Sequence, residues 1–185
     1  MNAISSQLCQ HVSARSRVGF VLAIAERVLP ALAKNANAFR AAQEALGDGW
    51  RWEEGESQRA LELYDRHVEA LAVQGSMIKD KEASAAMSTA TSAFFYMVWH
   101  AFAQDIASGL VREGDVPNDM ADVTEEVIDE VCDYAAGLPC AIDGGSLRWL
   151  NVCQRIFLVP IPLNWAPPVP GNTLTRVRVP HAIIQ

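Results

Sequence analysis

The side chains best suited to bind a charged partner are the carboxylates of one acidic segment. Between Glu113 and Asp143 the chain has ten Asp or Glu residues and neither Lys nor Arg. Ion pairs one helical turn apart cannot offset the repulsion between these charges, which costs stability unless a cation or a basic partner approaches. A charged outer face is equally typical of simple solvation. The candidate partner-binding residues of this segment are Asp115, Asp119, Asp122, Glu125, Glu126, Asp129, Glu130 and Asp133.

The four histidines do not form a metal-binding pattern. A di-iron helical bundle uses Glu-x-x-His pairs, but no glutamate stands three residues before any histidine of this chain. The sequence also lacks the His-x-x-x-His, Cys-x-x-Cys, calcium-loop, phosphate-loop and nucleophile-elbow patterns. We therefore predict no metal, no cofactor and no catalytic residue.

Two histidines have contrasting surroundings. His67 follows Asp65 and Arg66 on a helix that looks surface-facing, which predicts a solvated side chain. His100 follows Trp99 in the most apolar segment, which favours a core histidine bound by a backbone carbonyl. The alternative is a helical-bundle enzyme in which His100 works with buried carboxylates.

Trp50 and Trp52 flank Arg51 just after a glycine-containing stretch. This arrangement predicts aromatic packing over one end of a bundle. Trp and Arg are also the residue types enriched at the energetic centres of protein interfaces. Trp50 and Trp52 are therefore added to the candidate partner-binding residues.

The elements that must hold these residues are helical. Apolar residues recur every three or four positions over much of the chain, which is the pattern of amphipathic helices. One segment is apolar on nearly all sides and is expected in the middle of a bundle. Gly47-Asp48-Gly49 predicts a helix end and a turn. Helices are predicted at 5–29, 31–46, 57–74, 79–111 and from Asn118 or Thr124 to 136, with a short one at 146–153.

The fold class is therefore mainly α, a single-domain bundle of about five to six helices over residues 1–153. Residues 154–185 form a Pro-rich, acid-free tail, in which 156–159 and 174–179 have the composition of short extended segments. Residues 1–143 carry a formal net charge of −11, whereas residues 144–185 carry four arginines and no acid.

Bulk composition limits the classes of partner. A formal net charge of −7 is unfavourable for binding nucleic acid or an anionic membrane. The longest apolar run, residues 20–25, is too short to span a bilayer, and the N-terminus has no signal-peptide pattern. Four scattered cysteines match no disulfide scaffold. These features predict a cytoplasmic protein.

Three segments carry a family resemblance. They are FVLAIAERVLP at residues 20–30, GWRWEEG at 49–55 leading to LYD at 63–65, and FYMVWHAF at 95–102. Together they resemble a family of small all-helical immunity proteins of bacterial polymorphic and contact-dependent toxin systems. The resemblance covers roughly residues 15–136 and leaves the tail outside it.

This resemblance implies a cytosolic protein, encoded beside a toxin, that binds and neutralises the toxin without catalysis. If the toxin is a nuclease, its substrate-binding surface is basic and complements the acidic segment, with faster association through electrostatic steering. Besides the enzyme alternative, a small homo-oligomeric helical regulator, whose apolar tail packs on a neighbouring copy, stays open.

Overall fold

The computed structural model describes residues 13–136 and residue 138. They form five α-helices and three short 3-10 turns, with no strand among them, which confirms the mainly α bundle. The predicted helix at 146–153, the tail at 154–185 and everything before residue 13 lie outside the described part of the chain. The elements are α2 (Ala14–Val28), η1 (Leu29–Leu32), α3 (Ala36–Glu53), α4 (Ala60–Met77), α5 (Lys81–Ala107), η2 (Glu113–Asp115), η3 (Asn118–Met120) and α6 (Val127–Ala136).

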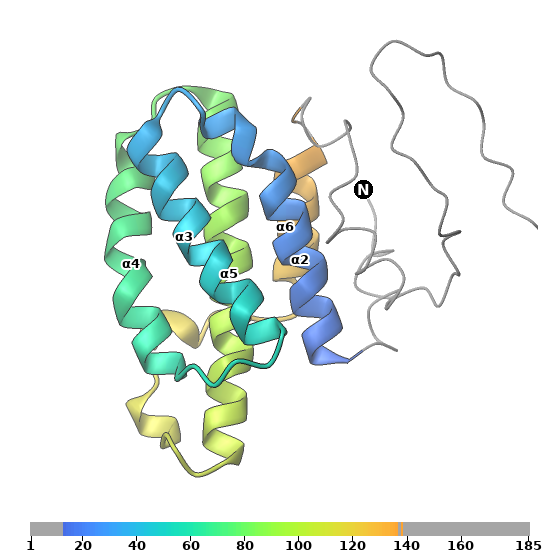
Figure 1. Ribbon diagram of the computed structural model, residues 1–185, viewed down its shortest axis with the longest axis vertical. Helices are drawn as coiled ribbons and strands as arrows, with labels where there is room; N and C mark the ends of the chain where they lie inside the picture. The colour runs from blue at the N-terminus through green and yellow to red at the C-terminus, as the bar shows by residue number, and fades with distance from the viewer. Residues whose placement is uncertain (1–12, 137, 139–185) are drawn as a thin grey trace, which may run out of the picture.

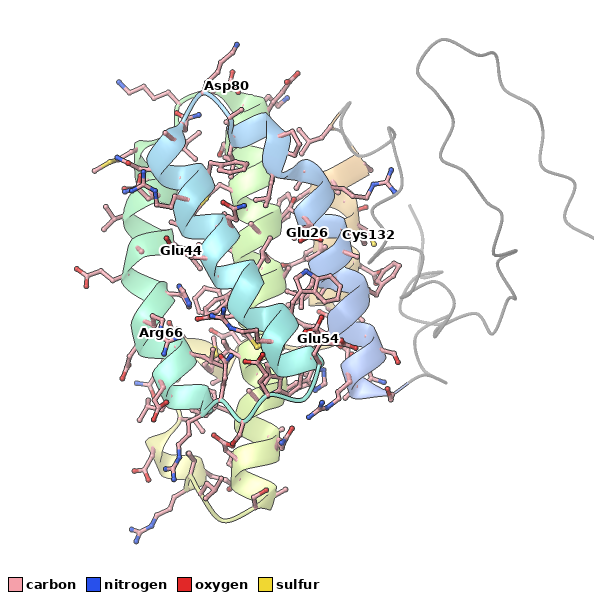
Figure 2. All side chains as sticks on the ribbon, viewed as in Figure 1. Glu26, Glu44, Glu54, Arg66, Asp80 and Cys132 are labelled. Atoms are coloured by element: carbon pink, nitrogen blue, oxygen red, sulfur yellow. The ribbon has the colours of Figure 1, made fainter. Side chains whose placement is uncertain are left out.

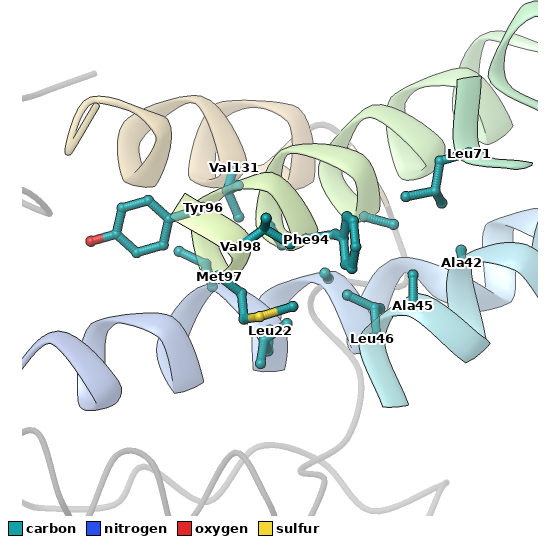
Figure 3. Packing of buried hydrophobic residues seen from close by; sticks show 14 of the residues in the cluster. Leu22, Ala42, Ala45, Leu46, Leu71, Phe94, Tyr96, Met97, Val98 and Val131 are labelled. Atoms are coloured by element: carbon teal, nitrogen blue, oxygen red, sulfur yellow. The ribbon is translucent and has the colours of Figure 1, made fainter. Parts of the chain in front are cut away.

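Helix α5 occupies the middle of the bundle, where it packs against α2, α3, α4 and α6 (Figure 1). Its many alanines allow these helices to approach closely, while its larger apolar side chains fill the space between them. Figure 3 shows Phe94 and Met97 of α5 among Leu22, Leu46 and Val131 of its neighbours. The buried residues of this helix include Ala86, Ala90, Ala93, Phe94, Met97 and Ala101.

Helix α3 does not end where two glycines predict a turn. It continues through Gly47, Asp48 and Gly49 as far as Glu53. A Cβ atom at Gly49 would lie only 2.9 Å from Cδ2 of Leu22, so glycine here permits close approach of α2 rather than a helix end. The prediction of a turn here is wrong, because Gly49 is explained by its close contact with a residue of another helix and not by a helix end.

The starts of two helices are set by caps. Helix α2 starts at Ala14, because Ser13 is its N-cap and accepts the backbone N–H of Ser16 through Oγ at 3.2 Å. Residues 5–12, also predicted to be helical, lie outside the described part of the chain. Helix α4 starts at Ala60, whose backbone N–H donates to Oδ2 of the buried Asp105 of α5 at 2.9 Å. A side chain from another helix therefore caps α4.

Helix α4 packs on the bundle through one face. Leu63, His67 and Leu71 are buried there, whereas Leu61 is 41% exposed. Within the described residues, no helix has both the length and the apolarity needed to cross a membrane.

Candidate partner-binding surface

Helix α6 has one apolar and one acidic face, as its sequence pattern predicts. Val127, Ile128, Val131 and Ala135 are buried against the bundle. Tyr134 lies at the edge of the apolar face and is 43% exposed. The acidic residues that are exposed on this helix and at its start are Glu126, Glu130 and Asp133, while Asp129 is half-buried.

The side chain of Glu125, just before α6, contacts the bundle as well as solvent. Its Oε1 accepts from Nη2 of Arg17 on α2 at 2.9 Å, and its Oε2 accepts from the hydroxyl of Tyr96 on α5 at 2.5 Å. Arg17 also donates to the Tyr96 oxygen through Nε at 3.3 Å. This cluster fixes the start of α6 against α2 and α5, and it neutralises a carboxylate that the sequence places on the outer face.

The Tyr96 hydroxyl and the His100 imidazole beside this cluster are both neutral. Burial and the hydrogen bond to Glu125 raise the pKa of Tyr96, so its hydroxyl stays protonated and donates. Burial lowers the pKa of His100 to about 4. Its Nε2 lies 4.0 Å from Oε1 of Glu125 and has no hydrogen-bond partner among the described residues, unlike the expected contact to a backbone carbonyl. The structure thus brings His100 near a carboxylate that is already bound by Arg17 and Tyr96.

The loop carboxylates Asp115, Asp119 and Asp122 are also exposed. Oδ2 of Asp119 accepts the Tyr64 hydroxyl of α4 at 2.6 Å, and this hydrogen bond, with burial, raises the pKa of Tyr64 to about 12. In Figure 1 the yellow η2 and η3 turns lie at the lower end of α4, whereas the orange α6 lies beside α2. The structure therefore separates the acidic segment into a loop group near α4 and a helical group on α6.

Residues 16–137, about two thirds of the chain, match the protein family described as Immunity protein Imm6. The chain belongs to the Imm6 immunity proteins. The resemblance to all-helical immunity proteins is thereby confirmed, and the family implies a toxin as partner. No curated protein and no solved structure was found to match the chain.

Trp50 and Trp52 of this Imm6 protein are core residues. Their exposed fractions are 3% and 4%, and the guanidinium of Arg15 lies 5.3 Å from the centre of the Trp52 ring. The sequence placed them after the end of a helix, but α3 continues and carries them into the bundle. Their burial removes them from the surface that the Imm6 fold presents to a partner.

His67 is likewise buried rather than solvated. Its Nε2 lies 2.6 Å from Oδ2 of Asp48, and Arg66 donates to the same oxygen at 2.8 Å. Arg66 is labelled in Figure 2 near the lower end of α4, next to α3. The helical spacing predicts this burial, although the charged residues just before His67 suggest a surface position. His67 is four residues from both Leu63 and Leu71 and therefore shares their buried face.

Proposed function

We propose that this Imm6 protein neutralises a cognate bacterial toxin domain by binding it, without catalysis, through the acidic face of α6. This acidic face comprises Glu126, Glu130 and Asp133. The observation that carries the proposal is their shared exposure on α6 and at its start, while the opposite face of this helix is buried. No Lys or Arg occurs in the sequence from residue 113 to residue 136 to neutralise them.

The complementary partner surface is basic. We infer that the toxin is a nuclease, because an enzyme that binds phosphate chains needs concentrated Lys and Arg. Opposite potentials on the two proteins accelerate their encounter and disfavour partners of the wrong charge. The loop carboxylates Asp115, Asp119 and Asp122 extend the negative potential toward α4.

The test measures binding of the full chain to the product of the reading frame immediately upstream of its gene, where the toxin is expected. We expect the association rate to fall about tenfold or more between about 0.01 M and about 1 M salt, since the Debye length shrinks from about 30 Å to about 3 Å. Equal rates at both salt concentrations contradict the electrostatic mechanism. Absence of binding at both concentrations contradicts the proposal as a whole.

Charge reversal locates the surface. The triple variant Glu126→Lys, Glu130→Lys, Asp133→Lys is expected to weaken binding about tenfold or more, because like charges then face the partner. The control variant Glu44→Lys, Glu62→Lys, Asp65→Lys makes the same change of net charge at exposed sites on α3 and α4. Equal loss in both variants assigns the effect to net charge and not to α6.

A further inference from the structure

Among the described residues, one side of the central helix α5 is left uncovered along its N-terminal half. A hollow of about 300 Å³ opens there between α4 and α6, with α5 as its floor. We call it the α4–α6 groove. Its lining residues on the floor are Ser84, Met87, Ser88, Thr91 and Ser92.

The walls of the α4–α6 groove are built mainly from small residues on one side and from an aromatic ring on the other. Leu71, Ala72, Gly75 and Ser76 line it from α4, and Tyr134 lines it from α6. Small side chains on the floor and on the α4 wall leave the space between the two helices unfilled. Side chains of another molecule can therefore enter the α4–α6 groove, and the backbone of that molecule can approach α5 closely.

Both rims of the groove carry exposed carboxylates. On α6, Glu130 lies one turn before Tyr134 and therefore on the same face. On α4, Glu69 lies three residues before Ala72 and is also exposed. Lys81, one turn before Ser84, marks the upper end of the groove.

We propose that the α4–α6 groove receives a basic amphipathic helix of the toxin. Apolar side chains of that helix enter the hollow over Ser88, and its flanking Lys or Arg residues pair with Glu69 on one rim and Glu130 on the other. Insertion of an amphipathic helix into a groove is a common mode of protein recognition. This inference rests on the proposed function and specifies which element of the toxin is bound.

Charge complementarity selects this occupant over a second copy of the chain. Helices α4 and α6 of another copy would bring further carboxylates against Glu69 and Glu130, and like charges across an interface are unfavourable. The chain's own residues 144–185, with four arginines and no acid, are the competing occupant that the experiment must distinguish.

The first experiment fills the groove without changing charge. We expect Ser88→Trp in the full chain to weaken binding of the upstream-encoded toxin domain at least about tenfold, because the ring occupies the hollow. Gln104→Trp is the control, on an exposed site of the same helix that does not line the groove. If the unsubstituted chain binds and Ser88→Trp binds with unchanged affinity, the proposed binding in the α4–α6 groove is overturned, whereas the proposed function is not affected. No binding by the unsubstituted chain overturns both.

The second experiment leaves the floor unaltered. A photoreactive phenylalanine replaces the exposed Tyr134, and the cross-linked peptide is identified by mass spectrometry in the mixture with the toxin domain. A toxin peptide with apolar residues flanked by Lys or Arg supports the proposal, whether or not Ser88→Trp folds. A cross-link to this chain's own residues 144–185 or to a second copy overturns it, as does a toxin peptide of another character.

Discussion

The imidazole Nε2 of His67 lies 2.6 Å from the carboxylate of Asp48, with both side chains buried between α3 and α4. A carboxylate only accepts, so Nε2 must carry the hydrogen. Burial and the neighbouring Arg66 guanidinium lower the pKa of His67, which keeps the ring neutral at pH 7. Arg51 and Arg66 bind the same carboxylate from the half-exposed side. Asp48 is therefore the polar link between two helices.

Removal of this carboxylate is expected to destabilise the bundle. Asp48→Ala leaves the buried His67 N–H without an acceptor and two guanidinium groups without their common partner. We expect the free energy of unfolding to fall by about 3 kcal/mol in chemical denaturation. Glu44→Ala, at an exposed site one turn earlier on α3, is the control and should change stability by less than about 0.5 kcal/mol. Equal effects of the two substitutions would refute the role of Asp48.

The two glycines of α3 are expected to respond differently to substitution by alanine. Gly47 has no heavy atom within 4 Å of an added Cβ, so Gly47→Ala should stabilise the helix by about 0.5–1 kcal/mol. Gly49→Ala places its methyl group 2.9 Å from the buried Leu22, and repacking there offsets that gain. Gly49→Leu should cost about 1–3 kcal/mol. Thermal unfolding of the three variants compares them directly, and a stabilised Gly49→Leu protein would be inconsistent with the packing of α2 on α3.

Acid is expected to destabilise the protein partly through His100. The pKa of this imidazole is about 4 in the folded chain and 6.5 in its unperturbed state. Below pH 6.5 the unfolded chain binds a proton that the folded chain excludes, so stability falls as the pH drops toward 4, by up to about 3 kcal/mol. His100→Gln cannot titrate there. Unfolding measured at pH 7 and pH 4.5 should show a smaller loss for His100→Gln than for the unsubstituted chain, and parallel losses would exclude His100 as the cause.

The contacts of Glu125 predict how firmly α6 is held. Glu125→Ala removes the acceptor shared by Arg17 and Tyr96, and we expect it to destabilise the protein by about 1–2 kcal/mol. Amide hydrogen exchange should accelerate chiefly in α6. The neighbouring exposed Glu126 is the matched control, since Glu126→Ala breaks no contact with α2 or α5. Exchange in α6 that is unchanged by Glu125→Ala would show that apolar packing alone holds the helix.

The sequence predicts the helical class, the central place of α5 and the two faces of α6, because apolar periodicity reports these features directly. It does not predict contacts between residues far apart in the chain. Arg17 and Glu125 are 108 residues apart, so no local pattern shows that this carboxylate is paired. Gly49 resembles a helix stop until the position of Leu22 is known. The boundary proposed at residue 153 and the acidic partner-binding residues remain predictions.

The two sides of α5 differ in what a substitution there costs. The buried side of α5 forms part of the core, so substitution of Phe94 or Met97 by a smaller residue destabilises the whole fold. Its groove side carries half-exposed hydroxyl residues such as Ser88 and Ser92, whose replacement alters little of the packing. Substitutions on the groove side of α5 therefore cost little stability, and a new binding specificity can evolve on this helix without a change in the packing of the bundle. If the α4–α6 groove binds the toxin as proposed, a few residues on the groove side of α5 determine which related toxins the protein neutralises.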